Sequence, residues 1–518
     1  MKNLNKYDKT FLLYLLFLFV FLLFTFNFNS LVADEGTHLL LSAFYKDLLS
    51  DILQTKNFSF AHAYNFGINY LVHYPKLQIA YPPLYHLTTA IVFSLFGLSE
   101  FLGRLVNLLY AIGSFFIFYL LLRKFFSSKV ALIATVIFSF SPISLLYSSR
   151  ALQDFSMYFF VLLATYIFSF SLKYLTKMSR KSVLLFLSLG LTTFLAAMGK
   201  QMGGIIAFFF FSIFLFKLYK SKNRKAILFH TFLFLFTFLA LLSPYLFVLS
   251  KVGGIEINKL VAIGYAAEQG EPTSFLDPYF WLWYLIQPTL NSLYFLPLFL
   301  ISLILFAYRK EKNWKILLGW FILFYFSLTL IPNKEVRFSQ LFLLPCYITT
   351  AFYLDKLKKN LYWITFLIIY AIFSLYTFIP KVYYYPAKEI SYQIYNSLPA
   401  GGNVAVFSEG DPFFSSVLMW HLRVLDEKRK IQVFRACIFD NKTGEEILQT
   451  IKDNNIHTIV YQTWQPRNIE KLKPYLKFRF KVSKNGFTTK VYEFKDFQLK
   501  QRERICNFIC LTRKEICY

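Results

Sequence analysis

Long apolar runs separated by short basic loops constrain the fold of this chain more than any other feature. The first run covers residues 11–28, and runs of similar length recur as far as residue 379. A helix needs an apolar stretch of roughly 20 residues to cross a bilayer. Hydrophobic residues make up 57% of the 518-residue chain, more than a soluble domain uses. We therefore expect a mainly α-helical, polytopic membrane protein.

The positions of Lys and Arg indicate how these runs are oriented. Lys2, Lys6 and Lys9 precede the first run and place the N-terminus in the cytoplasm. This run is long for the core of a signal peptide, so we expect it to be retained as a span. The run at residues 84–96 is too short to span; if it lies at the interface, every later basic loop falls on the cytoplasmic side. The pattern predicts about eleven spans and an extracytoplasmic C-terminus.

The net charge of +27 has its explanation in the same loops. In a soluble protein such a charge would indicate nucleic-acid binding. Here the Lys and Arg residues fall largely between apolar runs, where they set the orientation in the membrane. We therefore expect membrane lipids, and no nucleic acid, as partners of this charge.

The composition changes near residue 383 and divides the chain. Residues 1–382 are predicted to form the transmembrane domain, with a first outer loop at about 29–100. Residues 383–495 alternate short helix and strand patterns, which predicts a small extracytoplasmic α/β domain. This part contains no glycine-rich nucleotide motif. The basic tail, 496–518, is expected to be loosely ordered.

An acidic stretch follows the first span on its outer side. Asp34 and Glu35 are adjacent, and His38 comes three residues later. Carboxylates beside the hydrocarbon region are costly, so their usual interpretation is functional. The alternative is that both residues only cap a helix over residues 37–49. The three side chains are also possible ligands for a divalent metal ion, although their spacing is not diagnostic.

Three further groups of polar residues are predicted on the same side. Arg150 and Asp154 are four residues apart, so on one helix they can form an ion pair that is either functional or structural. Lys200 and Gln201 end a span where the positive-inside rule disfavours a lysine, which indicates a bound anion or a snorkelling side chain. The third group is Lys334, Glu335 and Arg337. A rigid turn, Tyr81-Pro82-Pro83, followed by Tyr85 and His86, either belongs to the site or only starts a helix.

These residue types together indicate a chemistry. Lys and Arg stabilise a phosphate leaving group, and a carboxylate deprotonates an attacking hydroxyl group. Transfer of a sugar passes through an oxocarbenium-like transition state. Nucleotide sugars are not usually available outside the cytoplasm, so a lipid-linked donor fits the expected location.

Several motifs in the first part of the chain resemble a known family. They are YPPLYH at Tyr81, LSEFLGRL at Leu98 and SRALQDF at Ser149, in this order after the Asp34-Glu35 loop. Over residues 30–350 the chain resembles the GT-C membrane glycosyltransferases, in particular the protein O-mannosyltransferase and lipid A aminoarabinose transferase superfamily. The stretch beginning at Asn333 is also similar to the HKExRF motif of lipid-linked-oligosaccharide mannosyltransferases, with Asn333 in place of its histidine.

The resemblance implies a multi-spanning fold and a polyprenyl-phosphate sugar as donor. It implies that Asp34 is the catalytic base, and we assign a catalytic role to the adjacent Glu35 as well. We assign donor-phosphate binding to Lys200, Lys334, Arg337 and Arg150. We assign substrate binding to His38, Tyr81, Tyr85, His86, Asp154, Gln201 and Glu335.

The sequence thus predicts an integral-membrane glycosyltransferase that acts on a lipid, glycan or protein acceptor at the extracytoplasmic face. One alternative is a transporter or flippase of lipid-linked sugars, which would be expected to show related halves with broken helices at mid-membrane. Another is a non-catalytic subunit of envelope assembly. The five cysteines form no metal-binding motif; Cys506, Cys510 and Cys517 are either partly paired in an extracytoplasmic tail or free.

Overall fold

The computed structural model describes residues 5–251, 254, 274–286, 295–331, 333–357, 359–381, 384–407, 415–462, 470–501, 504–509 and 514–518. The chain forms two compact units that interleave along the sequence. The helical unit comprises Met1–Phe26, Ala80–Tyr85 and Arg104–Lys381. The mixed unit comprises Asn27–Ile79, His86–Gly103 and Val382–Tyr518. The first outer loop therefore lies largely in the same unit as the C-terminal residues.

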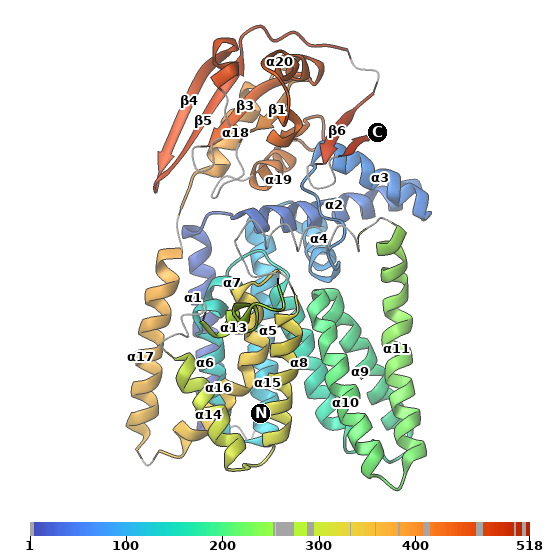
Figure 1. Cartoon of the computed structure of the whole chain (residues 1–518), viewed down its shortest axis with the longest axis vertical. Helices are drawn as coiled ribbons and strands as arrows, with labels where there is room; N and C mark the ends of the chain where they lie inside the picture. The colour runs from blue at the N-terminus through green and yellow to red at the C-terminus, as the bar shows by residue number, and fades with distance from the viewer. Residues whose placement is uncertain are drawn as a thin grey trace. The chain divides into compact units, whose positions relative to one another are not determined.

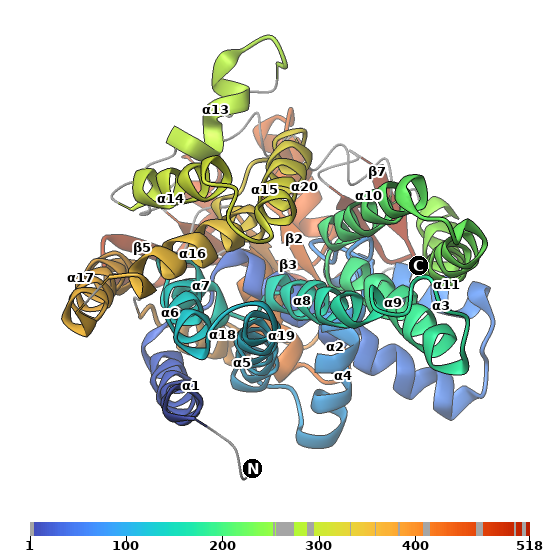
Figure 2. The same cartoon turned by 90° about the horizontal axis from the view of Figure 1, so that it is seen from below.

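The helical unit consists of long apolar helices that run alongside one another (Figure 1). Their bounds are α1 Lys6–Thr25, α5 Glu100–Phe125, α6 Ser128–Ser139, α7 Pro142–Ser148, α8 Asp154–Ser171, α9 Arg180–Gly199, α10 Ile205–Lys220, α11 Arg224–Lys251, α13 Pro278–Ile286, α14 Leu296–Tyr308, α15 Trp314–Thr329, α16 Ser339–Asp355 and α17 Asn360–Phe378. Seen from below, α9 packs between α8 and α11, and α16 packs against α6, α14 and α15 (Figure 2).

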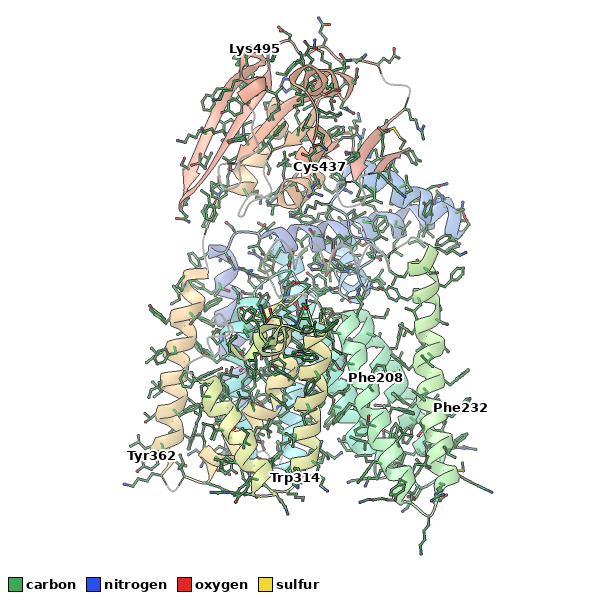
Figure 3. All side chains as sticks on the ribbon, viewed as in Figure 1. Phe208, Phe232, Trp314, Tyr362, Cys437 and Lys495 are labelled. Carbon is green, nitrogen blue, oxygen red and sulfur yellow. A yellow bond between two sulfur atoms is a disulfide. The ribbon has the colours of Figure 1, made fainter. Side chains whose placement is uncertain are left out.

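Apolar side chains cover the outside of the helical unit. Phe208 on α10, Phe232 on α11 and Tyr362 on α17 are more than half exposed and point away from their helices (Figure 3). In water such a surface would drive association, whereas in a bilayer it faces lipid of the same polarity. The protein is therefore an integral membrane protein, as predicted.

The described helices correspond closely to the predicted spans. Seven of them are long and apolar enough to cross a membrane, or eight if α6 and α7, which meet at 65°, form one bent span. The bend divides the predicted span at residues 130–147. Ser141 caps the N-terminus of α7, and Pro142 is the first residue of that new helix. The predicted span at 281–307 corresponds to α13 and α14, and residues 287–294 between them lie outside the described part, as does most of the predicted outer loop at 251–280. The total of about eleven spans stays a prediction.

The mixed unit combines three helices of the first outer loop with a C-terminal α/β domain. The loop helices are α2 Ala33–Thr55, α3 Phe60–His73 and α4 Leu84–Phe96, the first two residues of α4 belonging to the helical unit. The later elements are α18 Ala387–Ser397, β1 Asn403–Val406, α19 Ser415–Leu425, β2 Val433–Arg435, α20 Gly444–Asp453, β3 Ile456–Gln462, β4 Leu476–Lys484, β5 Phe487–Phe494, β6 Cys506–Ile509 and β7 Lys514–Cys517.

Five of these strands form one sheet in the order β2-β1-β3-β5-β4. The strands β2, β1 and β3 are parallel, as the alternation of helix and strand predicts, and β5 pairs antiparallel with both β3 and β4. One face of the sheet is closed by buried apolar residues that include Phe434, Ile459 and Leu476. The predicted α/β domain is confirmed.

The expectation of a loosely ordered tail is wrong. Strands β6 and β7 form an antiparallel hairpin, and a disulfide joins Cys506 to Cys517 across it. Cys437 is also disulfide-bonded, whereas Cys346 is buried and free. Cys510 lies outside the described residues. The basic composition of the tail concealed a cross-linked element, because the pairing of cysteines is not visible in a single sequence.

Candidate functional site

The acidic stretch of the mixed unit forms the first turn of α2. This helix begins at Ala33, four residues earlier than predicted, so it includes both carboxylates. The Val32 amide donates to Glu35 Oε2 at 3.2 Å, and Glu35 is fully buried. Asp34, in contrast, is exposed. The capping alternative therefore applies to Glu35, while Asp34 is the carboxylate that the turn presents at the surface.

A buried histidine pair lies one turn further along α2. His38 Nδ1 and His86 Nε2 are 2.8 Å apart, and both rings are almost completely inaccessible. A hydrogen bond between two imidazoles requires one donor and one acceptor nitrogen, so at least one ring is neutral. The structure thus brings together two predicted substrate-binding residues that are 48 positions apart.

The proline turn that precedes this histidine begins a helix. Helix α4 starts at Leu84, directly after Pro82 and Pro83, as the helix-start interpretation predicted. In the helical unit, Tyr85 is fully buried and Tyr81 is half-buried. Tyr85 therefore has a packing role, which is compatible with the substrate-binding role assigned to it.

A cluster of four charged side chains lies in the helical unit. Lys200 Nζ is 2.7 Å from Asp154 Oδ1, and Arg337 Nη1 is 3.5 Å from Asp154 Oδ2. Arg337 Nη2 is also 2.5 Å from Glu335 Oε2. Asp154, Lys200 and Arg337 are buried, whereas the Glu335 side chain is 27% exposed. We call these four residues the charged cluster.

Local sequence features explain why distant residues meet here. Asp154 is the first residue of α8, where the helix dipole favours a negative charge. Lys200 follows the last residue of α9, Gly199. A Cβ atom at Gly199 would lie 2.7 Å from the backbone nitrogen of Met157, so only glycine permits this approach of α9 to α8. The close approach carries the lysine to the aspartate.

The environment of Lys200 explains its unusual position. Burial lowers the pKa of Lys200, and the neighbouring Asp154 carboxylate opposes this effect. The ammonium group also lies 4.5 Å from the centre of the Phe338 ring. Lys200 is therefore buried and paired, so the snorkelling alternative does not describe it.

Three other predicted residues have different surroundings. The expectation that Arg150 and Asp154 share a helical face is wrong, because Arg150 lies in the turn before α8 begins. Lys334 Nζ donates to the carbonyl of Thr329 at 2.5 Å, so it stabilises the C-terminus of α15. Gln201 is exposed in the short 3₁₀ turn after α9.

The structure adds polar residues around the cluster that sequence reasoning missed. Tyr158 donates from its hydroxyl group to the carbonyl of Arg337 at 2.5 Å. Asn107 donates to the carbonyls of Tyr147 and Arg150, both at 2.7 Å. Gln153 is 2% exposed. Gln153 directly precedes Asp154, but an amide inside a membrane segment was the only sequence signal for Asn107.

Three buried polar atoms of Arg150 and of the residues just described lack hydrogen-bond partners within the described part of the chain. They are Asn107 Oδ1, Arg150 Nε and Gln153 Oε1. A buried polar atom without a partner costs roughly 1–3 kcal/mol, so such atoms are usually satisfied by water or ligand. Arg150 therefore retains donor capacity in a polar part of the helical unit.

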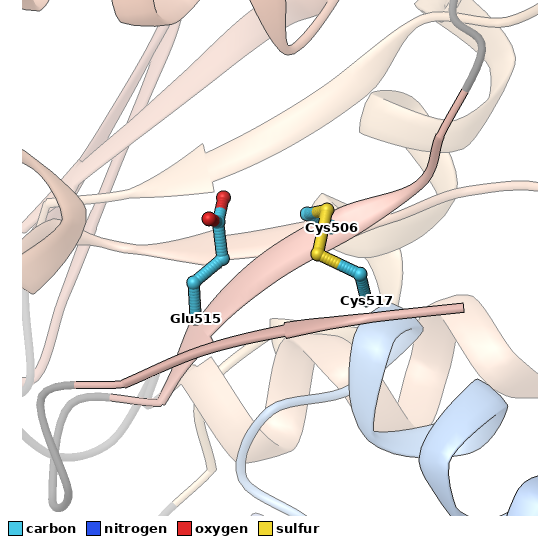
Figure 4. Close-up of side chains that lie close together, drawn as sticks. All are labelled: Cys506, Glu515 and Cys517. Carbon is cyan, nitrogen blue, oxygen red and sulfur yellow. A yellow bond between two sulfur atoms is a disulfide. The ribbon is translucent and has the colours of Figure 1, made fainter.

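The metal prediction receives little support from the described residues. Among the described residues, one group of three side chains has its possible ligand atoms close enough together to hold a metal ion. It consists of Cys506, Glu515 and Cys517, drawn in Figure 4. The two sulfur atoms are bonded to each other, so they are not available as thiolate ligands. No cofactor is established by this arrangement, and a divalent ion at Asp34, Glu35 and His38 stays a prediction.

Comparisons with known proteins agree with the predicted resemblance. A family model described as dolichyl-phosphate-mannose-protein mannosyltransferase matches residues 80–247. A search of curated proteins finds no match. Among solved structures, ArnT from Cupriavidus metallidurans bound to undecaprenyl phosphate has a TM-score of 0.60 at 13% identity, over 95% of this chain and 99% of that chain.

Two structures from Archaeoglobus fulgidus are also similar. The oligosaccharyltransferase tethered with an acceptor peptide has a TM-score of 0.53 at 13% identity, over 94% of this chain and 74% of that chain. AglB in complex with an inhibitory peptide and a dolichol-phosphate has a TM-score of 0.51 at 12% identity, over 94% of this chain and 75% of that chain. The chain therefore has an ArnT-like fold, and the resemblance predicted from the motifs is confirmed.

Proposed function

We propose that this protein is an integral-membrane glycosyltransferase that moves a sugar from a polyprenyl-phosphate donor to an acceptor at the extracytoplasmic face. The observation that carries the proposal is the charged cluster, a buried group of paired charges at helix ends in a chain with a GT-C fold. Ionisable groups at such positions in membrane proteins usually serve function. The acceptor, whether lipid, glycan or protein, is left open.

The donor phosphate is assigned to the cations of the helical unit. The four assigned cations are Lys200, Lys334, Arg337 and Arg150, and two carboxylates, Asp154 and Glu335, pair with Lys200 and Arg337. These six residues therefore carry an excess of two positive charges. Arg337 is the strongest candidate because its planar guanidinium can hold two phosphate oxygens at once. The bound undecaprenyl phosphate of ArnT and the dolichol-phosphate of AglB support a lipid phosphate of this class.

The base is assigned to Asp34. In the proposed step the acceptor hydroxyl gives its proton to Asp34 while its oxygen attacks the anomeric carbon. The bond from that carbon to the phosphate oxygen breaks, and the electron pair leaves with the phosphate, whose charge the cations stabilise. Glu35, buried and bound to the Val32 amide, supports the turn that carries Asp34 and remains assigned to the catalytic pair. The family resemblance implies inversion at the anomeric carbon.

The remaining assigned residues bind and orient the substrates. His38 and His86 form a pair close in sequence to Asp34, and Tyr81 is half-buried before α4. Asp154 and Glu335 orient the cations by pairing with them. Gln201 is exposed beside Lys200 in sequence and offers an amide to a sugar hydroxyl.

A deletion strain tests the function as a whole. We expect mass spectrometry of its envelope lipids, glycans and proteins to show the loss of one sugar modification. The wild-type gene should restore that modification, and purified protein should transfer the sugar from its polyprenyl phosphate. An unchanged envelope profile, or restoration by a protein that cannot transfer sugar in the purified state, would contradict the proposal.

The proposed orientation has its own test. The Cys506–Cys517 disulfide supports an oxidising compartment for the C-terminal part. An impermeant thiol reagent applied to intact cells should label a Lys495→Cys variant, whose site is exposed, and leave Lys222→Cys unlabelled. The wild-type chain provides the background. Labelling of position 222 from outside, without labelling of 495, would reverse the topology.

A further inference from the structure

Helix α2, which carries Asp34 in its first turn, packs directly on α19 of the C-terminal α/β domain (Figure 1). A Cβ atom at Gly36 would lie 2.7 Å from the carbonyl carbon of Ser416 and 2.8 Å from the nitrogen of Val417. Both are backbone atoms, which cannot move aside as the end of a flexible side chain can. The first turn of α2 therefore rests on the first turn of α19, two residues from Asp34.

An ion pair between a buried arginine and a partly buried aspartate joins the same two helices further along. Arg423 of α19 donates to Asp47 Oδ2 of α2, from Nε at 3.1 Å and from Nη2 at 2.5 Å. Tyr70 of α3 donates to the same oxygen at 2.8 Å and accepts from Arg423 Nε at 2.9 Å. Arg423 is 4% exposed and Tyr70 is fully buried. This triad is therefore satisfied internally and joins three helices.

The two contacts together restrain α2 more than either alone. Gly36 and Asp47 are eleven residues apart, which corresponds to about 16 Å along a helix. A helix held at one point can pivot, whereas one held at two separated points keeps both its axis and its rotation. The distance from the triad to the acidic turn is thus spanned by one rigid element.

From this geometry we propose that α19 positions the acidic turn of α2, so that the C-terminal domain is part of the transfer machinery. Gly36, Asp47 and Arg423 are positioning residues, since they act through the placement of Asp34. The inference rests on the proposed function only in taking Asp34 as the base; the coupling of α19 to α2 is independent of the substrate.

The test compares Arg423→Gln and Gly36→Ala with Arg479→Gln in the full-length protein in detergent. Arg479 pairs with Glu493 at 2.6 Å between β4 and β5, in the same unit but away from α2. Hydrogen exchange of the amides at 36–44 should rise about tenfold in the first two variants, because a charged hydrogen bond or a close packing contact is lost. It should not change in Arg479→Gln.

Two further readouts separate positioning from general damage. In cells that lack the native gene, Arg423→Gln should lower the amount of product about tenfold, and Arg423→Lys should restore part of it. Binding of polyprenyl phosphate, the donor lipid without sugar, should stay within about twofold of the wild-type value. Unchanged exchange at 36–44 in both variants would overturn the proposal, as would equal losses of lipid binding and product.

The outcomes also distinguish this inference from the proposed function. If Asp34→Asn forms normal product, the assignment of the base fails and the positioning role fails with it, even where exchange rises. If Asp34→Asn forms none while Gly36→Ala and Arg423→Gln match the wild type in exchange and product, only the positioning role fails.

Discussion

The charged cluster and the acidic turn of α2 hold their charges in opposite ways. In the cluster, Asp154, Lys200 and Arg337 come from three separate parts of the chain and form ion pairs in a buried place. In the acidic turn, Asp34 and Glu35 are neighbours in the sequence; Glu35 is buried and accepts from the Val32 amide, whereas Asp34 is exposed. Tertiary packing brings the charges of the cluster together, whereas the two carboxylates of the turn are together already because they are adjacent in the chain.

This difference affects what a substitution does. A buried, paired charge leaves an uncompensated partner when it is removed, so stability and function change together. An exposed carboxylate in a helix turn has little influence on packing, so its removal should change chemistry far more than stability. The four experiments below test this contrast, from the largest expected effect to the smallest.

The largest effect is expected at the exposed carboxylate. Replacing Asp34 by Asn should lower sugar transfer roughly 10²–10⁴-fold, because a positioned general base is lost. The thermal midpoint in detergent should change only slightly, because Asp34 is exposed in the first turn of α2. The matched control is Asp51→Asn, which alters a carboxylate in the last turns of the same helix and should transfer sugar normally. Normal turnover in Asp34→Asn would remove this residue from the mechanism.

Removal of the central carboxylate of the cluster should mainly reduce stability. Asp154→Ala leaves the buried charges of Lys200 and Arg337 without the carboxylate that they share. Losing one partner of a buried ion pair lowers the free energy of unfolding by roughly 3–5 kcal/mol. The thermal midpoint should fall clearly below that of Glu311→Gln. Glu311 pairs with Lys356 in an exposed place, where a pair contributes roughly 0–1 kcal/mol. Equal midpoints would show that the cluster is not a structural unit.

The arginine of the cluster should determine binding of the donor lipid. Arg337→Ala should weaken binding of polyprenyl phosphate roughly 10–100-fold, and Arg337→Lys should recover only part of this loss. We expect a smaller loss for Lys334→Ala, because that ammonium group binds carbonyl oxygens at the end of α15. Arg309→Ala, at the end of α14, is the control. If all variants bind alike, the phosphate is held by other residues.

The smallest effect concerns the helix that supports α2. Burial, with a smaller contribution from Lys388, lowers the pKa of His421 on α19 to about 3, compared with 6.5 for an ordinary histidine. Below pH 6.5 His421 becomes protonated in the unfolded chain, whereas in the folded chain it stays neutral until the pH approaches 3. The free energy of unfolding therefore decreases as the pH falls from 6.5 towards 3. The loss between pH 6.5 and 5 should be about 1.5 kcal/mol.

A variant isolates that contribution. His421→Gln should have its thermal midpoint lowered less by the change from pH 6.5 to 5 than the wild-type protein, because one proton-linked group is gone. An equal decrease in the two proteins would mean that His421 is protonated in the folded state.

The fold was largely predictable because its main signals are local. Among the described residues, most of the apolar runs form one helix whose backbone groups bond within the run, so the length and flanking charges of the run suffice to recognise it. The alternation of helix and strand after residue 383 identified the α/β domain in the same way. The bend at Pro142 was missed, since it depends on the directions of the two helices. A disulfide in the tail was one of two alternatives, and the sequence could not decide between them because it does not show which cysteines meet.

The candidate site was predictable only in part. The motifs named Asp34, Lys200 and Arg337 as residues of interest without showing which of them meet. Lys200 lies 46 positions from Asp154, and no periodicity connects them. The spacing of Arg150 and Asp154 predicted that Asp154 pairs with Arg150 on one helical face. This prediction was wrong because α8 begins only at Asp154, so Arg150 is not part of the helix.

The sequence alone determined that this chain enters a membrane as apolar helices, carries a small α/β domain and presents two carboxylates after its first span. Hydrophobicity, charge placement and helix capping act within a few residues, so they can be read without the fold. Only the tertiary structure decided that Lys200 and Arg337 share Asp154, that His38 meets His86, and that α19 supports α2. Ion pairs and close packing depend on which helix ends come together, and that is set by the whole chain.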